Sequence, residues 1–473
     1  MGALNGLGAA ERAALRAAAA RAAEGAARAG RPRVAALRLP VAGTHPLQQL
    51  AAAAGSERFF WEVPARGLSL VGLGAAAVFE AAGPGRFEAA AAWADALWDE
   101  AVLEGSPARA EAGPLLVGGF GFADAPEGDP RWRAFPPLRL VLPERLESRV
   151  AGRAWQTHVY VARPGEEPGD AAERADARAS AEAPPATHPA ETEDARPVFH
   201  AAADSPHARY RGAVADALDA IAAGELEKVV LARSCTLSRP GGFDGARVLR
   251  LLRAAHPTCF LYGVGGGEAL LVGASPERLL RRSGAHLRAD ALAGSAPRGR
   301  SPDEDERLAR ALRESKKEQA EHEAVKRALL EALGEACEPL RAPEAPQLLR
   351  LEGIQHLHTP VSGRIRPGAP RSLLALAGRL HPTPAVAGAP REAALAFLRG
   401  HEATSRGWYA GGVGWLAPSG DGELAVALRC ALLRGDDATL HAGAGVVTGS
   451  TPEEELAETR LKLRAALAAL LEI

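Results

Sequence analysis

The sequence predicts an α+β protein (α/β if the term covers any mixture of helices and strands) with a single large fold. In this fold, antiparallel sheets are flanked by helices. Many short strand-like stretches are separated by Gly- and Pro-containing turns. Several helices with clear start signals interrupt them without a regular β-α alternation, which argues against a parallel sheet. The chain has 473 residues, 47% of them hydrophobic, which is ample for a large core.

The first part of the predicted fold spans residues 1–163 and opens with an alanine-rich helix. Apolar runs bounded by turn residues predict the strands, and apolar residues at helical spacing predict one helix. The strands are expected at 33–41, 67–74, 115–123 and 138–150, and the helix at 87–103. Short strands joined by tight turns favour antiparallel pairing.

Residues 164–197 differ from the rest of the chain in composition. They contain no Leu, Ile, Val, Phe, Tyr or Trp, so burial of large side chains cannot offset the entropy lost on ordering. This composition predicts a disordered loop or linker.

The second part spans residues 198–473. Ser301-Pro302-Asp303-Glu304 and Thr451-Pro452-Glu453-Glu454 each combine an N-cap hydroxyl, a proline at N1 and a glutamate at N3. They predict a helix from Ser301 to about Leu333 and a helix at the end of the chain. Further helices are expected at 207–225, 371–380 and 391–400, and strands at 227–237, 349–365, 407–417, 423–433 and 439–450.

Charge and composition exclude several classes of protein. The net charge of -2 gives no electrostatic footprint for nucleic acid or an anionic membrane surface, and no apolar run has the length of a membrane span. The four cysteines are far apart, which fits neither a disulfide framework nor a zinc site. The N-terminal residues lack the apolar region of a secretory signal, so a cytoplasmic location is expected.

Lysine is unusually rare in this chain. Only five of the 56 basic residues are lysines, namely Lys228, Lys316, Lys317, Lys326 and Lys462. Arginine cannot replace a lysine whose ammonium must titrate. A surviving lysine is therefore a candidate for chemistry, although chance survival is the preferred interpretation for Lys316, Lys317 and Lys326.

Two residues could act as a base and an acid. Lys228 opens a predicted apolar strand, where desolvation lowers the pKa of a lysine from about 10.4. The alternative is a strand-end lysine that reaches water, and position alone favours it. Glu277 follows an apolar strand at a Ser-Pro turn, where a carboxylate serves either as a general acid or as a capping group.

Acidic residues gather on two predicted helices. Glu314, Glu318 and Glu321 lie on one helical face, and Glu455 and Glu458 share a face of the last helix with Lys462. Carboxylates from two helices could converge on Mg²⁺, but a solvated acidic face is the more common meaning of such spacing.

Glycine-rich turns and one arginine complete the candidates. The turns at 292–299, 409–415 and 442–450 match no phosphate-binding motif, so they serve either a carboxylate ligand or tight backbone geometry. Arg429 lies within an apolar strand pattern, and a buried arginine usually has a bidentate carboxylate partner.

Taken in order, these segments resemble the chorismate-utilising enzymes and, among them, the isochorismate synthases. The resemblance rests on collinear motifs that cover nearly all of the chain outside the first helix and residues 164–197. The motifs read FFWEVPARGLSLVGLGAA, KVVLAR, GASPERLL, ALAGSAPRG, KEQAEHEAV, IQHLHTPVSG, LHPTPAVAG, GWYAGGVGW, ALRCALL, AGAGVVTGS and EEELAETRLKL.

The resemblance implies a large chorismate-binding fold around a Mg²⁺-dependent site. It places the general base on Lys228, which would activate water for attack at C2 of chorismate. It places the general acid on Glu277, which would protonate the departing C4 hydroxyl from the other face of the ring. The metal ligands fall on Glu321 and Glu458, with Glu455 as an outer-shell partner.

By the same resemblance, Mg²⁺ holds the ring carboxylate and Arg429 the pyruvyl carboxylate. The residues that line the substrate are expected to be Gly294, Ser295, His356, Ala385, Arg429, Gly443 and Lys462. The family often has Thr at the position of Ser295, a difference that keeps the hydroxyl.

Other reactions of the family fit the motifs less well. Anthranilate synthases lack the lysine base, and aminodeoxychorismate synthases carry a PIKGT segment where this chain reads ALAGS. Ala385 stands where the amine-using relatives have Thr. Salicylate synthases share the base and acid and add pyruvate elimination, so they are the closest alternative.

The resemblance also sets expectations about partners and pathway. The product would serve menaquinone or siderophore biosynthesis, no glutaminase subunit is expected, and the protein would be a monomer or a weak homodimer. A catalytically inactive scaffold relative is the non-enzyme alternative, but such a chain would be expected to have lost Lys228, Glu277, Glu321 or Glu458.

Overall fold

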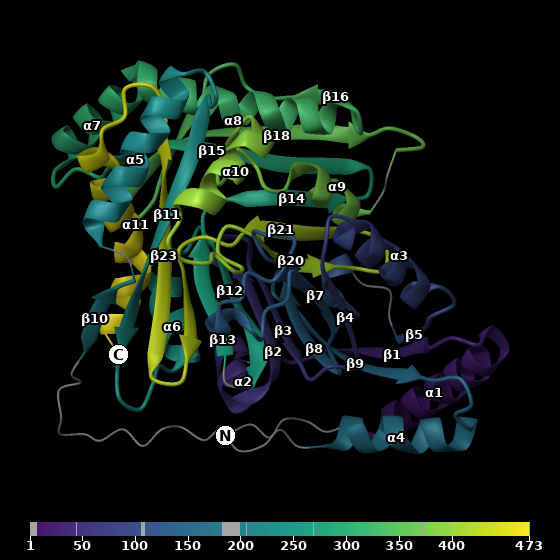
Figure 1. Ribbon diagram of the computed structural model, residues 1–473. Helices are drawn as coiled ribbons and strands as arrows, with labels where there is room; N and C mark the ends of the chain where they lie inside the picture. The colour runs from purple at the N-terminus through teal and green to yellow at the C-terminus, as the bar shows by residue number, and fades with distance from the viewer. Residues whose placement is uncertain are drawn as a thin grey trace.

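A computed structural model describes residues 7–43, 45–105, 109–181, 199–204, 206–267, 269–369 and 372–472. In these residues the chain forms two large sheets with helices around them (Figure 1). Strands pair antiparallel in both sheets, except that β1 and β5 are parallel. The predicted α+β architecture with antiparallel sheets is confirmed.

The first sheet joins strands from both ends of the chain. Its order is β10 (His200–Ala203), β11 (Lys228–Ser238), β23 (Asp437–Val446), β22 (Cys430–Arg434), β13 (Ala269–Ser275), β12 (Phe260–Gly267), β2 (Gly55–Val63), β3 (Leu68–Leu73), β8 (Arg145–Val150), β9 (Arg153–Ala162), β1 (Arg33–Val41) and β5 (Val102–Gly105), with β19 (Gly388–Ala389) also on β11.

The second sheet is likewise shared between the two parts of the sequence. Its order is β16 (Cys337–Arg341), β18 (Ile354–Ile365), β15 (His286–Pro297), β14 (Arg278–Ser283), β21 (Gly422–Val426), β20 (Gly412–Leu416), β6 (Leu116–Phe120), β7 (Leu138–Leu142) and β4 (Ala77–Ala81), with β17 (Gln347–Arg350) on β18.

Helices cover the sheets on several sides. They are α1 (Ala9–Ala29), α2 (Pro46–Ala52), α3 (Arg86–Trp98), α4 (Pro168–Ser180), α5 (His207–Ala222), α6 (Gly245–Ala255), α7 (Pro302–Glu314), α8 (Lys316–Gly334), α9 (Leu373–Leu380), α10 (Arg391–His401) and α11 (Pro452–Leu471). Helix α11 lies along β23, and α8 packs on β15 and β18 (Figure 1). None of the helices in the described ranges is long and apolar enough to cross a membrane.

The prediction of a disordered segment at 164–197 is wrong for its first half. Pro168–Ser180 forms α4, which packs on α1 through Ala171 and Ala175, and Asp176 accepts two hydrogen bonds from Arg12 at 2.8 Å. Alanines on both helices let the backbones approach closely, so large side chains are not needed. Residues 182–198 lie outside the described residues.

The predicted single helix from Ser301 to Leu333 is in fact two helices. Ser315 has an extended backbone, and its hydroxyl accepts a hydrogen bond from the N–H of Glu318 at 3.3 Å. It therefore ends α7 and caps α8. The sequence carries this signal, because Ser315 and Glu318 have the capping-box spacing. The break puts Glu314 on α7, apart from Glu318 and Glu321 on α8.

The stretches 138–150 and 423–433 each contain two strands. β7 and β21 belong to the second sheet, whereas β8 and β22, which directly follow them, belong to the first. The connections therefore cross between the sheets.

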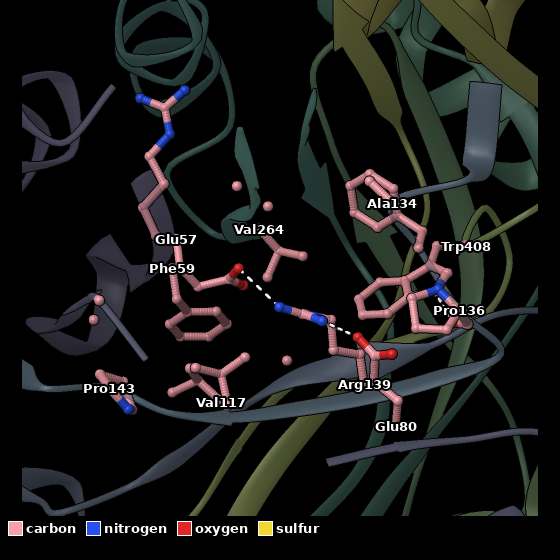
Figure 2. A pocket seen from close by; sticks show the side chains of 18 of the residues that line it. Glu57, Phe59, Glu80, Val117, Ala134, Pro136, Arg139, Pro143, Val264 and Trp408 are labelled. Atoms are coloured by element: carbon pink, nitrogen blue, oxygen red, sulfur yellow. Dashed lines mark hydrogen bonds and ion pairs between the residues drawn. The ribbon is translucent and has the colours of Figure 1, made fainter. Parts of the chain in front are cut away.

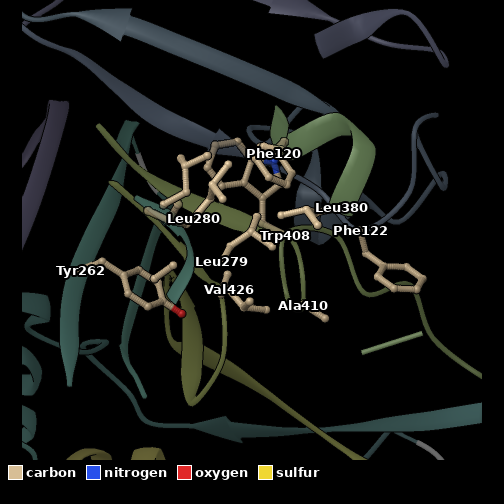
Figure 3. Packing of buried hydrophobic residues seen from close by; sticks show 14 of the residues in the cluster. Phe120, Phe122, Tyr262, Leu279, Leu280, Leu380, Trp408, Ala410 and Val426 are labelled. Atoms are coloured by element: carbon tan, nitrogen blue, oxygen red, sulfur yellow. The ribbon is translucent and has the colours of Figure 1, made fainter. Parts of the chain in front are cut away.

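The main core lies between the two sheets. It includes Trp61 and Leu70 of the first sheet and Phe120 and Leu140 of the second, all at most 2% exposed. Figure 3 shows members from both sheets, including Tyr262 of β12. Burial of this much apolar surface is the main source of the stability of such a fold.

Candidate active site

The site lies where two connections cross between the sheets. One connection, between β13 and β14, carries Glu277, and the other, between β21 and β22, carries Arg429. The Val426 N–H donates to the Glu277 carbonyl at 3.0 Å, and the Ala274 N–H donates to the Arg429 carbonyl at 3.2 Å. The two crossings are thereby tied together, and they deliver both side chains to one cavity.

The structure brings all the predicted site residues together. The cavity is lined by Glu277, Gly294, Ser295, Glu321, His356, Ala385, Arg429, Gly443 and Lys462. The remaining two border it through ion pairs, with Lys228 Nζ 2.9 Å from Glu321 Oε1 and Glu458 Oε1 2.6 Å from Lys462 Nζ. The roles of these residues stay predictions.

Lys228 is held away from solvent. It is the first residue of β11, opposite Ala389 of β19, and is 1% exposed. The alternative that a strand-end lysine reaches water is therefore wrong. A buried ammonium needs a counter-charge, which the carboxylate of Glu321 on α8 supplies.

Glu277 is suited to donate a proton. Burial, together with the negative charge of Asp290 on β15, raises the pKa of Glu277 to about 8, although Lys228 and Lys462 act in the opposite direction. The Glu277 carboxyl is therefore protonated near neutral pH. A carboxylic acid held neutral in this way is the form required of a general acid.

Four carboxylates from α8 and α11 meet three ammonium groups at one side of the cavity. Besides the Lys228–Glu321 and Lys462–Glu458 pairs, Lys317 Nζ lies 2.8 Å from Glu455 Oε1. The fourth carboxylate is Glu318, whose Oε2 accepts a hydrogen bond from the Ser295 N–H at 2.8 Å. Lys317 thus has a specific partner in this cluster.

This cluster carries an excess of negative charge. Burial raises the pKa of Glu318 to about 7, helped by the nearby charges of Glu321 and Glu458. Burial also acts to raise the pKa of Glu321, but the ammonium groups of Lys228, Lys462 and Lys317 together outweigh it and the net shift is downward.

The carboxylates fit Mg²⁺ by donor chemistry. Mg²⁺ is commonly held by one or two carboxylates and completes its shell with water and substrate oxygens, and Glu321 and Glu458 would supply that number. Within the described residues, no three His, Cys, Asp or Glu side chains are already arranged to hold an ion. Lys228 and Lys462 each form an ion pair with one oxygen, Oε1, of Glu321 and Glu458, respectively.

A chain of hydrogen bonds orients further polar groups that line the cavity. The Arg429 guanidinium donates to His356 Nε2 at 3.1 Å and to the Lys462 carbonyl at 3.2 Å. Because a guanidinium has no acceptor, His356 Nε2 must accept, and the imidazole proton lies on Nδ1, 3.0 Å from Ser295 Oγ. Burial and the charge of Arg429 hold the pKa of His356 well below its usual value.

The partners of Arg429 differ from the expectation. A bidentate carboxylate partner was predicted, whereas its hydrogen bonds in the described structure go to a neutral imidazole and a backbone carbonyl. Its φ of +51° sets the side chain at the crossing between β21 and β22. The charge of the half-buried Arg429 is therefore available to a carboxylate of a ligand.

The model of the chorismate binding enzyme family matches residues 18–471. The chain belongs to this family. The match spans both sheets and the cavity between their crossings, so the predicted resemblance is confirmed.

Three of the proteins that this chain resembles are named isochorismate synthases. A salicylate biosynthesis isochorismate synthase of Pseudomonas aeruginosa is 38% identical over 415 residues, covering 87% of this chain and 84% of the relative. Isochorismate synthase MenF of Bacillus subtilis is 32% identical over 422 residues, covering 87% and 88%. The structure of the menaquinone-specific isochorismate synthase MenF of Escherichia coli matches with a TM-score of 0.76 and 25% identity, covering 96% and 100%.

Sequence reasoning missed two contributors to the site of this chorismate binding enzyme. Gly445 of β23 leaves space for the Lys228–Glu321 pair, since a Cβ there would lie 2.2 Å from Glu321 Oε1. Tyr409 lines the cavity and stacks on His441 with ring centroids 5.2 Å apart. The glycine-rich turns were a signal for both residues, but without a sheet register they could not be assigned to one wall.

This chorismate binding enzyme has a second cavity, of about 290 Å³, between the two sheets. Phe59, Val264 and Trp408 form part of its apolar wall, and Arg139 crosses it to ion pairs with Glu57 and Glu80 (Figure 2). The Arg139 charge is thus already neutralised, and none of the predicted site residues lies here.

Proposed function

We propose that the protein is an isochorismate synthase, which converts chorismate to isochorismate. The observation that carries the proposal is a cavity lined by Glu277, whose carboxyl is protonated near neutral pH, and bordered by the buried Lys228 through its ion pair with Glu321. Displacement of a hydroxyl group by water needs an acid for the leaving oxygen and a base for the attacking one. The names of the relatives support the same reaction.

Each group has a defined step in this reaction. In its neutral amine form, Lys228 Nζ takes a proton from the water whose oxygen forms a bond to C2. The ring double bonds shift, the C4–O bond breaks, and the Glu277 carboxyl gives its proton to the departing oxygen, which leaves as water. One water enters and one leaves, so the net change is an isomerisation.

Cationic groups recognise the two carboxylates of chorismate. Arg429, oriented by His356 and the Lys462 carbonyl, would hold the pyruvyl carboxylate. Ser295 is free to donate its hydroxyl proton, because the Nδ1–H of His356 is directed at its oxygen. Glu321 and Glu458 would hold Mg²⁺, which would supply positive charge for the ring carboxylate. Glu321 would then stabilise the Lys228 ammonium less, which favours the neutral amine.

We further propose that the chain acts in the cytoplasm as a monomer or weak homodimer and without a glutaminase subunit. Water, not ammonia, is the nucleophile in this reaction, so no second active site has to supply it. The relatives include enzymes of menaquinone and of salicylate biosynthesis, and the product is the same for either pathway.

Incubation of the purified chain with chorismate and Mg²⁺, followed by separation of the products, tests the function. Isochorismate as the sole product supports it. Salicylate with pyruvate would identify a salicylate synthase instead, and unchanged chorismate would favour an inactive relative.

A further inference from the structure

The strand that begins with Lys228 lacks a continuous neighbour on one edge. Along its other edge, β11 pairs with β23 from Val229 to Ser238. On the edge away from β23, β11 pairs first with β19, at Lys228 and Val229, and then with β10, from Cys235 to Ser238. Between these two partners, no strand of the described residues is available to the carbonyl of Val230 and the N–H of Ala232.

A buried ion pair fills this gap. Arg406 Nη2 donates to the Val230 carbonyl at 2.6 Å, and Glu402 Oε1 accepts from the Ala232 N–H at 2.7 Å. The two side chains bind each other in a bidentate manner, with Arg406 Nε 2.8 Å from Glu402 Oε2. Together they replace one residue of a neighbouring strand, as buried backbone groups require.

Arg406 also contacts two other parts of the cavity wall, one through its guanidinium and one through its backbone carbonyl. Arg406 Nη1 donates to the Val386 carbonyl at 2.6 Å, and the Arg406 carbonyl accepts from the Tyr409 N–H at 2.9 Å. Val230, Val386 and Tyr409 all line the active-site cavity. Arg406 itself is 1% exposed, with its guanidinium carbon 4.1 Å from the centre of the Phe122 ring.

We propose that Arg406 and Glu402 are positioning residues for the reaction. They fix the strand that carries Lys228 relative to the Ala385–Val386 and Tyr409 walls, and neither touches the substrate. This inference rests on the proposed function for its kinetic consequence only. A guanidinium bound to four oxygens cannot be replaced by an ammonium without losing part of this geometry, and a displacement of about 1 Å in a catalytic group can cost about 100-fold in rate.

Arg406→Lys tests the proposal, with Arg33→Lys as the matched control. Arg33 is also buried, 2% exposed, and paired with Glu100 at 2.7 Å, but it lies on β1, near the opposite end of the sheet. We expect kcat for isochorismate formation to fall about 10- to 100-fold in Arg406→Lys with little change in KM, while its thermal unfolding midpoint falls no more than that of Arg33→Lys. Glu402→Gln, which keeps an oxygen for Ala232, should lose less activity than Arg406→Lys.

An unchanged kcat in folded Arg406→Lys would overturn the proposal, and so would a loss no greater than in Arg33→Lys. Hydrogen exchange of the Val230–Ala232 amides provides a readout that does not depend on the reaction. Faster exchange in Arg406→Lys than in Arg33→Lys supports the positioning role of Arg406 even if the wild-type chain forms a product other than isochorismate. Equal exchange in the two variants would contradict it.

Discussion

Lys228 and Glu321 form a buried ion pair that joins the first residue of β11 to α8, with 2.9 Å between Nζ and Oε1. Because both groups lie beside the cavity that Glu277 and Arg429 line, the pair links the proposed base to the carboxylates that would hold Mg²⁺.

Replacement of Lys228 by Ala should abolish turnover, because it removes the proposed general base and no other described ammonium pairs with Glu321 at this position. Mg²⁺-dependent binding of chorismate should persist. Steady-state kinetics and calorimetric binding check the two parts. Lys316→Ala, which removes an exposed lysine from the same helix as Glu321, is the control and should keep full activity. Full activity in Lys228→Ala would remove this lysine from its role.

Activity should decline as the pH rises above about 8. The pKa of Glu277 is raised to about 8 by burial and by Asp290, against Lys228 and Lys462, and only the protonated carboxyl can donate. The dependence of kcat/KM on pH for the free enzyme reports this value. Glu277→Gln should lower kcat by about 100-fold or more, and a wild-type profile that stays flat up to pH 9.5 would contradict the assignment.

The same shift predicts the pH dependence of stability. Folding raises the pKa of Glu277 from about 4.5 to about 8, so protonated Glu277 contributes its full stability below about pH 4.5. This contribution is lost progressively as the pH rises to about 8. Thermal unfolding of wild type and Glu277→Gln between pH 5 and 9 should therefore show the wild type losing stability relative to the variant. A constant difference between the two proteins would argue against a raised pKa.

Gly445→Ala should reduce activity far more than stability. The added Cβ would lie 2.2 Å from Glu321 Oε1 and 3.1 Å from Lys228 Cε, so the ion pair must shift. Gly400→Ala is the control, because Gly400 lies in α10 with open space around its Cβ position. Kinetics and thermal unfolding of both variants check this, and equal activities in the two would show that the pair tolerates displacement.

Loss of a proposed metal ligand should weaken Mg²⁺ binding in the absence of substrate. Glu458→Gln is expected to reduce the affinity by about tenfold or more, since a neutral amide attracts a divalent cation less than a carboxylate does. Isothermal titration of the substrate-free protein with MgCl₂ measures this. Glu453→Gln, an exposed position on the same helix, should bind like wild type. Equal affinity in Glu458→Gln would exclude Glu458 as a ligand.

Much of the fold could be predicted from local sequence signals. The caps at Ser301 and Thr451 begin helices as expected, with each hydroxyl accepting an N–H at 3.3 Å. Two predictions were wrong. The disordered segment at 164–197 was predicted from the absence of large apolar side chains, and the single helix from Ser301 to Leu333 was predicted without the N-cap at Ser315. Helix α4 lacks large apolar residues and packs through alanines. Ser315 caps the start of α8, where apolar periodicity alone predicts one continuous helix.

The candidate site was predictable in its residues but not in its connections. Family motifs indicated Lys228, Glu277 and Arg429, yet no local pattern shows that Glu277 and Arg429 lie on two connections that cross between sheets. The Arg406–Glu402 pair was invisible for the same reason. Its partners, Val230 and Val386, come from distant segments and are contacted through backbone carbonyls, which leave no trace in side-chain patterns.

The most direct test is the product formed from chorismate by the purified chain in the presence of Mg²⁺. The arrangement of Lys228, Glu277 and the α8 and α11 carboxylates predicts isochorismate, formed with loss of the original C4 oxygen and incorporation of solvent oxygen at C2. In ¹⁸O-labelled water the product should therefore carry one label. Product without label, or salicylate with pyruvate in place of isochorismate, would contradict the proposed reaction.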